Sequence, residues 1–127
     1  MSDLRDKGMK IRREVLGDAH VDRAEKNKTD FDAPFQEMIT DAAWGHVWSS
    51  DHFSNRERSI VTIALLAGLG HSDELAMHIK ACVNTGATRD DIREAIMHVA
   101  IYAGVPAANY AFAIAKKVFA EMDEGAS

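Results

Sequence analysis

The stretch that decides the fold covers residues 54–86 and reads SNRERSIVTIALLAGLGHSDELAMHIKACVNTG. Its first four residues have the spacing of a capping box, because Ser54 and Glu57 can each satisfy a backbone N–H at the start of a helix. The run 59–67 that follows is apolar on nearly every side, which is typical of a helix buried within a domain. We therefore expect a central helix here, ended by the two glycines that come next.

The segments around this helix repeat the pattern of helix and stop. The sequence predicts further helices over residues 4–16, 34–48, 73–84, 89–103 and 105–124. Ser72 or Asp73 is the expected cap of the helix over 73–84, which should stop at Gly86. Thr88 and Asp91 have the spacing of a capping box at the start of the helix over 89–103, which Gly104 should close. The polar residues 18–33 lack a clear period and are interpreted as a connection or arm. These features predict an all-α, compact bundle of five or six helices. We expect one domain over 1–127, with an N-terminal helix and arm over 1–33 and a helical core over 34–124.

Length and composition support one folded domain and exclude several other classes of protein. The 127 residues are 46% hydrophobic and 28% charged, a balance typical of a globular chain. The net charge of -5 argues against a general affinity for nucleic acid, and no apolar run is long enough for a membrane span. The lone Cys82 has no partner for an internal disulfide, and the polar start is unlike a secretory signal. We expect a cytoplasmic protein.

Two of the predicted helices carry the same arrangement of ionisable side chains. Each has a glutamate four residues before a histidine, so that the two side chains share a helix face. A carboxylate beside an imidazole can orient the ring and raise its basicity, as a general acid or base requires. The residues are Glu74 and His78 on the first helix, with His71 before it, and Glu94, His98 and Tyr102 on the second.

Two other readings of these pairs stay open at this point. Each pair could be a solvated surface contact, or histidine and glutamate from two helices could hold zinc or iron. The sequence contains neither the Glu-x-x-His spacing of di-iron bundles nor a His-Glu-x-x-His motif, so we expect no metal site. It also has no glycine-rich phosphate loop, and we expect no cofactor.

Two pairs of large side chains flank the start of the central helix. Trp44 and Trp48 are four residues apart on the helix expected over 34–48, so the two indoles should be neighbours in a core or an interface. Arg56 and Arg58 lie in the first helical turn, where positive charge is unfavourable against the helix dipole. This placement hints at a role other than helix stability.

Several of these motifs together resemble the carboxymuconolactone decarboxylase family. They occur in order between about residues 8 and 120, and they read WGHVW from Trp44, RERS from Arg56, ELAMH from Glu74, NTGAT from Asn84 and YAGVPAAN from Tyr102. The family belongs to a wider all-α group, the alkylhydroperoxidase D-like proteins, whose redox motif is Cys-x-x-Cys-x-x-x-His. Here His71 and Glu74 stand at the cysteine positions, His78 at the histidine and Ser59 at an upstream glutamate. The resemblance therefore disfavours a thiol peroxidase.

The resemblance implies a carbon–carbon lyase that acts on a small lactone dicarboxylate. The expected reaction converts 4-carboxymuconolactone to 3-oxoadipate enol-lactone and carbon dioxide in protocatechuate (β-ketoadipate) catabolism. The leaving carboxylate sits on a carbon vinylogous to the lactone carbonyl, so the substrate supplies its own electron sink and no cofactor is required. The resemblance also implies self-association, as a homohexamer or as a trimer.

The reaction suggests a role for each candidate residue. Arg58, and more weakly Arg56, would bind a substrate carboxylate, and His78 oriented by Glu74 would deliver the proton. His71 or Tyr102 would stabilise the enolate oxygen. His98 with Glu94 is a second proton-transfer pair, and Trp44 and Trp48 would wall the pocket.

Two alternatives to this function stay open. One is a metal-assisted hydrolase or hydratase that uses the two Glu–His pairs. The other is a non-catalytic helical protein whose apolar faces serve association. We expect neither nucleic acid nor a membrane as a partner.

Overall fold

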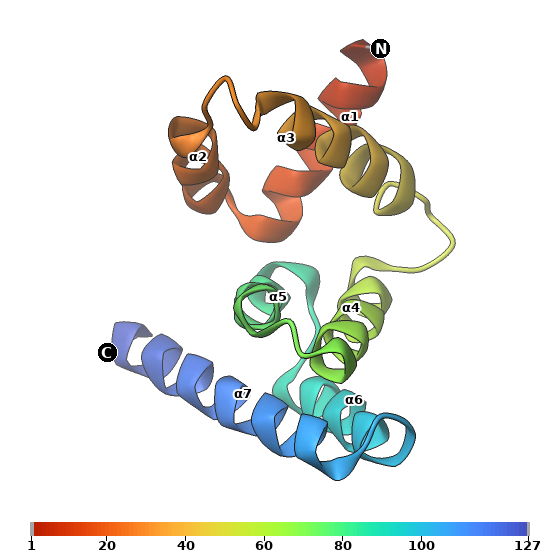
Figure 1. The fold of residues 1–127 in the computed structure, drawn as a ribbon, viewed down its shortest axis with the longest axis vertical. Helices are drawn as coiled ribbons and strands as arrows, with labels where there is room; N and C mark the ends of the chain where they lie inside the picture. Colours follow the sequence, from red (N-terminus) through yellow and green to blue (C-terminus); the bar gives the residue numbers. More distant parts are fainter. Residues whose placement is uncertain (1, 127) are drawn as a thin grey trace. The chain divides into compact units, whose positions relative to one another are not determined.

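The computed structural model describes residues 2–126, and every regular element in this range is helical (Figure 1). The elements are α1 (Ser2–Leu16), α2 (Asp18–Asn27), α3 (Ala33–Ile39), the π-helix η1 (Thr40–Val47), α4 (Asn55–Leu69), α5 (Ser72–Thr85), α6 (Arg89–Tyr102) and α7 (Val105–Ala126). This arrangement confirms the all-α prediction. The chain divides into two compact units between Asn55 and Arg56. No helix within the described residues is long and apolar enough to cross a membrane.

The prediction of five or six helices is too low, and helix α2 is one reason. The interpretation of residues 18–33 as a polar connection is wrong for its first ten residues, which form α2 after Gly17, a residue with φ of 90°. Val21 is the one buried residue of this helix, so its apolar period is too weak to recognise in the sequence. An ion pair of 3.2 Å between Arg12 Nη1 and Glu25 Oε1 ties α2 to α1.

The second reason is that the helix expected over 34–48 changes its geometry half-way. It begins as α3 and continues as the π-helix η1, in which the N–H of Trp48 donates to the carbonyl of Ala43 over 2.8 Å. Helix α1 lies unusually close to this segment. A Cβ on Gly8 would lie 2.3 Å from the carbonyl oxygen of Thr40 and 2.9 Å from the backbone nitrogen of Gly45. Only glycine at position 8 permits this approach.

Helices α4 to α7 share one hydrophobic core in the second unit. Its largest fully buried members are Ile63 from α4, Leu75 and Ile79 from α5, and Ile96 from α6. Burial of each such side chain is worth about 1.5–3 kcal/mol relative to exposure. Helix α7 packs against both α5 and α6 (Figure 1).

The turns of this unit lie at the glycines, and mostly at the helix caps, that the sequence predicts. Gly86 is the C-cap of α5 and Gly104 lies just after α6, with φ of +88° and +110° respectively. Thr88 and Asp91 form a reciprocal capping box at the start of α6, as predicted. One cap was predicted wrongly, because His71 rather than Ser72 or Asp73 occupies the N-cap position of α5. Its side chain makes no capping hydrogen bond, so no hydroxyl or carboxylate signal marks the position.

Candidate active site

Helix α5 places the three ionisable residues of the candidate site in different environments. His78 is 7% exposed and its Nδ1 atom is shielded from solvent, whereas Glu74 and His71 are exposed. Glu74 lies one turn before His78 on the same helix, as the spacing predicts. The structure therefore provides one buried imidazole with a carboxylate one turn away. The orienting role of that carboxylate stays a prediction.

A cluster of small polar side chains is buried at the last turns of α5 and includes one residue of α4. The hydroxyl oxygens of Ser59 and Thr85 lie 2.7 Å apart, and both residues are buried. The Cys82 thiol donates to the carbonyl of His78 over 3.3 Å. Burial raises the pKa of Cys82 to about 11, against an opposing effect of the two hydroxyls. Cys82 is thus a neutral thiol at physiological pH and no nucleophile.

The two arginines in the first turn of α4 have different surroundings. The Nε and Nη2 atoms of Arg56 donate to the two carboxylate oxygens of Asp91 over 2.8 Å and 2.7 Å. This fork, with the N–H of Thr88 as a further donor, holds the pKa of Asp91 well below its usual range. Arg58 is half-buried, and its Nε atom is shielded from solvent. The guanidinium of Arg56 is therefore already engaged with a carboxylate of the protein.

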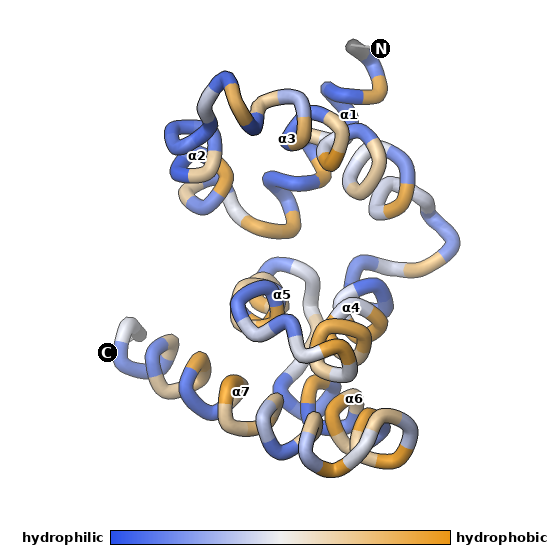
Figure 2. Tube along the Cα trace, in the orientation of Figure 1, coloured by the Kyte–Doolittle hydropathy of each residue, from blue (hydrophilic) through white to orange (hydrophobic). Residues whose placement is uncertain are grey.

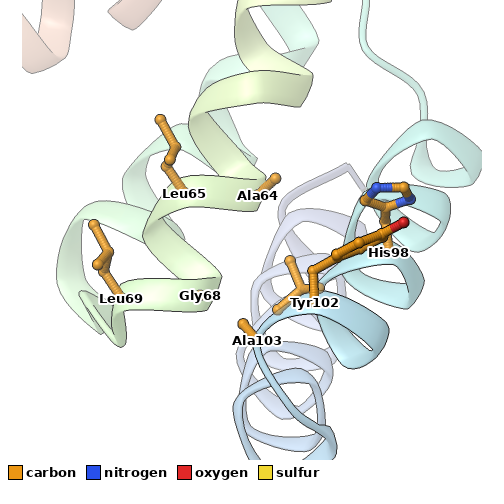
Figure 3. Close-up of a pocket in the computed structure, with 8 residues that line it drawn as sticks. Ala64, Leu65, Gly68, Leu69, His98, Tyr102 and Ala103 are labelled. Atoms are coloured by element: carbon orange, nitrogen blue, oxygen red, sulfur yellow. The ribbon is translucent and has the colours of Figure 1, made fainter.

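An apolar pocket of about 310 Å³ lies between the last turns of α4 and α6 (Figure 3). Its lining consists of Ala64, Leu65, Gly68 and Leu69 from α4, and His98, Val99, Tyr102 and Ala103 from the end of α6. Figure 3 shows the imidazole of His98 lying over the Tyr102 ring; the two centroids are 4.8 Å apart and the planes differ by 28°. The structure thus brings together two of the residues singled out in the sequence, against a wall of aliphatic side chains.

The remaining candidates are not among the residues that line this pocket. Glu94 is exposed and its carboxylate lies 3.5 Å from Nε of its neighbour Arg93, while His98 one turn later stacks on Tyr102. Trp44 and Trp48 are neighbours as predicted, with centroids 5.1 Å apart, and both are buried in the unit that ends at Asn55. Their part in a substrate pocket stays a prediction.

Two partners in the second unit were missed by the sequence analysis. Asp91 was recognised only as part of a capping box, although it also binds Arg56. Ser59 was noted only for its position relative to a family motif, although a hydroxyl within an apolar run is itself a signal of a buried hydrogen bond. Its partner Thr85 lies 26 positions away in the sequence.

These groups define what the unit can do chemically. A half-buried guanidinium can bind a carboxylate, a buried imidazole can transfer a proton, and an apolar pocket favours the loss of a charged group as a neutral gas. Within residues 2–126, no three His, Cys, Asp or Glu side chains gather closely enough to hold a metal ion.

Comparisons with known proteins agree with one another. Residues 33–117 match the carboxymuconolactone decarboxylase family. A 4-carboxymuconolactone decarboxylase of Acinetobacter baylyi is 47% identical over 115 residues, which cover 91% of this chain and 86% of the relative. A nitrosuccinic acid decarboxylase of Metarhizium robertsii is 39% identical over 123 residues, which cover 96% of this chain and 86% of the relative. A 4-carboxymuconolactone decarboxylase of Pseudomonas putida is 60% identical over 40 residues, covering 32% of this chain and 83% of the relative.

Proposed function

Because this chain belongs to the carboxymuconolactone decarboxylase family, we propose that it decarboxylates 4-carboxymuconolactone to 3-oxoadipate enol-lactone and carbon dioxide. The single observation that carries the proposal is the 47% identity to a 4-carboxymuconolactone decarboxylase across 91% of the chain. The relative from Metarhizium robertsii is also named a decarboxylase, so both names describe the loss of carbon dioxide. The protein is a carboxy-lyase.

The substrate itself explains how so small a protein achieves this reaction. When the ring carboxylate leaves as carbon dioxide, its bonding electrons form a new ring double bond, and the existing double bond moves toward the lactone carbonyl. Negative charge then rests on the carbonyl oxygen as an enolate. A proton added to the carbon next to the carbonyl completes the product. The protein must hold the remaining carboxylate, stabilise the enolate oxygen and deliver one proton.

In this proposal Arg58 holds the carboxylate that stays on the product. Arg56 is the weaker candidate, because its Nε and Nη2 atoms already donate to both carboxylate oxygens of Asp91. A half-buried guanidinium binds a carboxylate more strongly than an exposed one does, since less water competes for the charge.

His78 delivers the proton, and the exposed Glu74 supports it from the preceding turn. Burial suits this role, because a proton held away from bulk water passes to the substrate rather than to solvent. His71 or Tyr102 stabilises the enolate oxygen. His98 is the second candidate for proton transfer, and its position in the apolar pocket supports a part in substrate binding.

We further propose that the apolar face of α4 and α6 is covered by another copy of this chain, as part of a hexamer or a trimer. Residues 59–72 and 95–115 contain no Asp, Glu, Lys or Arg. Figure 2 shows hydrophobic residues along both helices. Leu65, Leu69 and Ile101 are 58%, 67% and 78% exposed, a degree of apolar exposure that is typical of an association surface.

Light scattering tests the association. The wild-type protein should have the mass of several chains, and Leu65→Glu should shift the mass toward one chain. A wild-type protein with the mass of one chain at micromolar concentration would contradict this part of the proposal.

The decisive test of the function is a direct assay. The purified protein is incubated with freshly generated 4-carboxymuconolactone, and the enol-lactone and carbon dioxide are measured in parallel. We expect equal amounts of the two products, at a rate that dialysis against EDTA leaves unchanged. Turnover no faster than the protein-free control would overturn the proposal. Nitrosuccinic acid is the comparison substrate, because a relative of this chain has that decarboxylase name.

A further inference from the structure

The first turn of α4 is held at two points by the corner between α5 and α6. At one point the Ser59 and Thr85 hydroxyls meet over 2.7 Å, with neither residue more than 9% exposed. At the other point, the two carboxylate oxygens of Asp91 accept hydrogen bonds from Nε and Nη2 of Arg56. Thr85 is the last residue of α5, and Asp91 lies in the first turn of α6. Arg58 lies between these two contacts in the sequence.

We propose that Asp91 and Thr85 are positioning residues, which hold the first turn of α4 so that Arg58 reaches the substrate carboxylate. The inference rests on the proposed function, in which Arg58 binds that carboxylate. Neither Asp91 nor Thr85 touches the substrate in this proposal. Each acts through a neighbour of Arg58 on the same turn.

Helix geometry explains why two contacts are needed. Residues 56 and 59 are three positions apart and therefore share a face of α4, which is the face turned toward the corner. Arg58 projects about 100° around the axis from Ser59. Side chains extend about 5–6 Å from a helix axis, so a rotation of the turn by about 20° would move the end of a side chain by about 2 Å. A misplacement of even about 1 Å can impair a catalytic or binding contact severely.

Asp91 accepts more hydrogen bonds from the protein than an ordinary surface carboxylate does. Its Oδ2 accepts from the N–H of Thr88 over 2.9 Å and from Arg56 Nε over 2.8 Å, while Oδ1 accepts from Nη2 over 2.7 Å. The Asp91 side chain is 15% exposed. The pair of Arg89 and Asp123 has the same two-bond form, at 3.2 Å and 2.6 Å, but its carboxylate is 63% exposed and it joins α6 to α7. This second pair is a matched control.

The test separates binding from turnover with the lactone as substrate. Asp91→Asn and Thr85→Val should each raise KM about five- to tenfold and change kcat less than twofold, because a displaced carboxylate-binding group weakens substrate and transition state alike. Asp123→Asn should leave both constants unchanged. Arg56→Lys keeps the charge but loses the planar fork, and it should reproduce the rise in KM even if Asp91→Asn folds poorly. Circular dichroism establishes the helicity of each variant.

A double-mutant cycle distinguishes this inference from the proposed function. If Asp91 acts through Arg58, then Asp91→Asn should cause no further rise in KM once Arg58→Ala is present. A rise of the same size in both backgrounds would overturn the inference while leaving the role of Arg58 intact. If Arg58→Ala alone leaves KM unchanged, the proposed role of Arg58 is wrong and the inference falls with it.

Discussion

The two ends of α4 differ in almost every physical property. At its first turn, the side chains of Arg56 and Ser59 are bonded to polar partners from other helices, Asp91 and Thr85. At its last turns, exposed leucines face an apolar pocket, and the polar groups on the opposite side are the stacked rings of His98 and Tyr102 (Figure 3). The same helix is thus held by side-chain hydrogen bonds at one end and carries exposed apolar side chains at the other.

This difference indicates a division of labour along the helix. A buried hydrogen bond has a preferred direction and distance, so it fixes how the first turn is oriented. Apolar contact has no such direction, so the last turns can accept a ligand or a second chain with little geometric demand. In our proposal the polar end positions Arg58 for the substrate carboxylate, and the apolar end offers a surface for an apolar ligand or a second chain.

The largest expected effect is on kcat, and it concerns which imidazole supplies the proton. His78→Ala should lower kcat at least about a hundredfold, since a positioned general acid contributes about 10²–10⁴-fold. His98→Ala, which removes the pocket imidazole, should lower kcat about tenfold or less. Steady-state kinetics with the lactone measures both changes.

The comparison between the two histidines has internal controls. Both variants should keep wild-type helicity by circular dichroism, and Glu74→Gln should follow His78→Ala in direction. If His98→Ala is the more damaging variant, then the chemistry takes place in the apolar pocket and the division of labour along α4 is wrong.

The next effect concerns stability at the polar end of α4. Thr85→Val removes one hydroxyl of the buried pair and leaves that of Ser59 without its partner, which should lower the free energy of unfolding by about 1–3 kcal/mol. Thr62→Val makes the same change on a partly exposed residue of α4, and it should shift stability by less than about 0.5 kcal/mol. Urea denaturation measures both.

The double variant Ser59→Ala with Thr85→Val sharpens this result. Removal of both hydroxyls leaves no orphaned polar group, so part of the lost stability should return. Equal destabilisation by Thr85→Val and Thr62→Val would mean that the buried pair does not hold α4.

The helices of the second unit could be predicted because their signals are local. The capping box of Thr88 and Asp91, the αL conformation of Gly86 and the apolar run of α4 each depend on residues within a few positions of one another. Helix α2 escaped prediction because its single buried residue, Val21, cannot establish a period. The π-helix that begins at Thr40 lies close to α1, and no local pattern in the sequence encodes that approach.

The candidate site could likewise be predicted only where its residues lie close together in the sequence. The spacing of Glu74 and His78 on one helix, and of His98 and Tyr102 on another, could be read directly from the sequence. The partner of Arg56 could not, because Asp91 lies 35 positions away and belongs to a different helix. Spacing identifies residues that share a face, whereas the pairing of faces depends on the packing of the whole unit.

The smallest expected effect is the dependence of the polar end on pH. The Arg56 fork and the N–H of Thr88 hold the pKa of Asp91 below the ordinary value of 3.8. A depressed pKa in the folded state means that this carboxylate stabilises the fold fully above about pH 4, and that the contribution is lost as the pH falls toward the folded-state pKa. The difference in Tm between the wild type and Asp91→Asn should therefore be largest near pH 7 and should shrink below pH 4. The Asp123→Asn variant should show a smaller difference at pH 7, because the carboxylate of Asp123 is more exposed. A wild-type advantage over Asp91→Asn that is unchanged from pH 7 to pH 3 would show that the charge of Asp91 does not stabilise the first turn of α4.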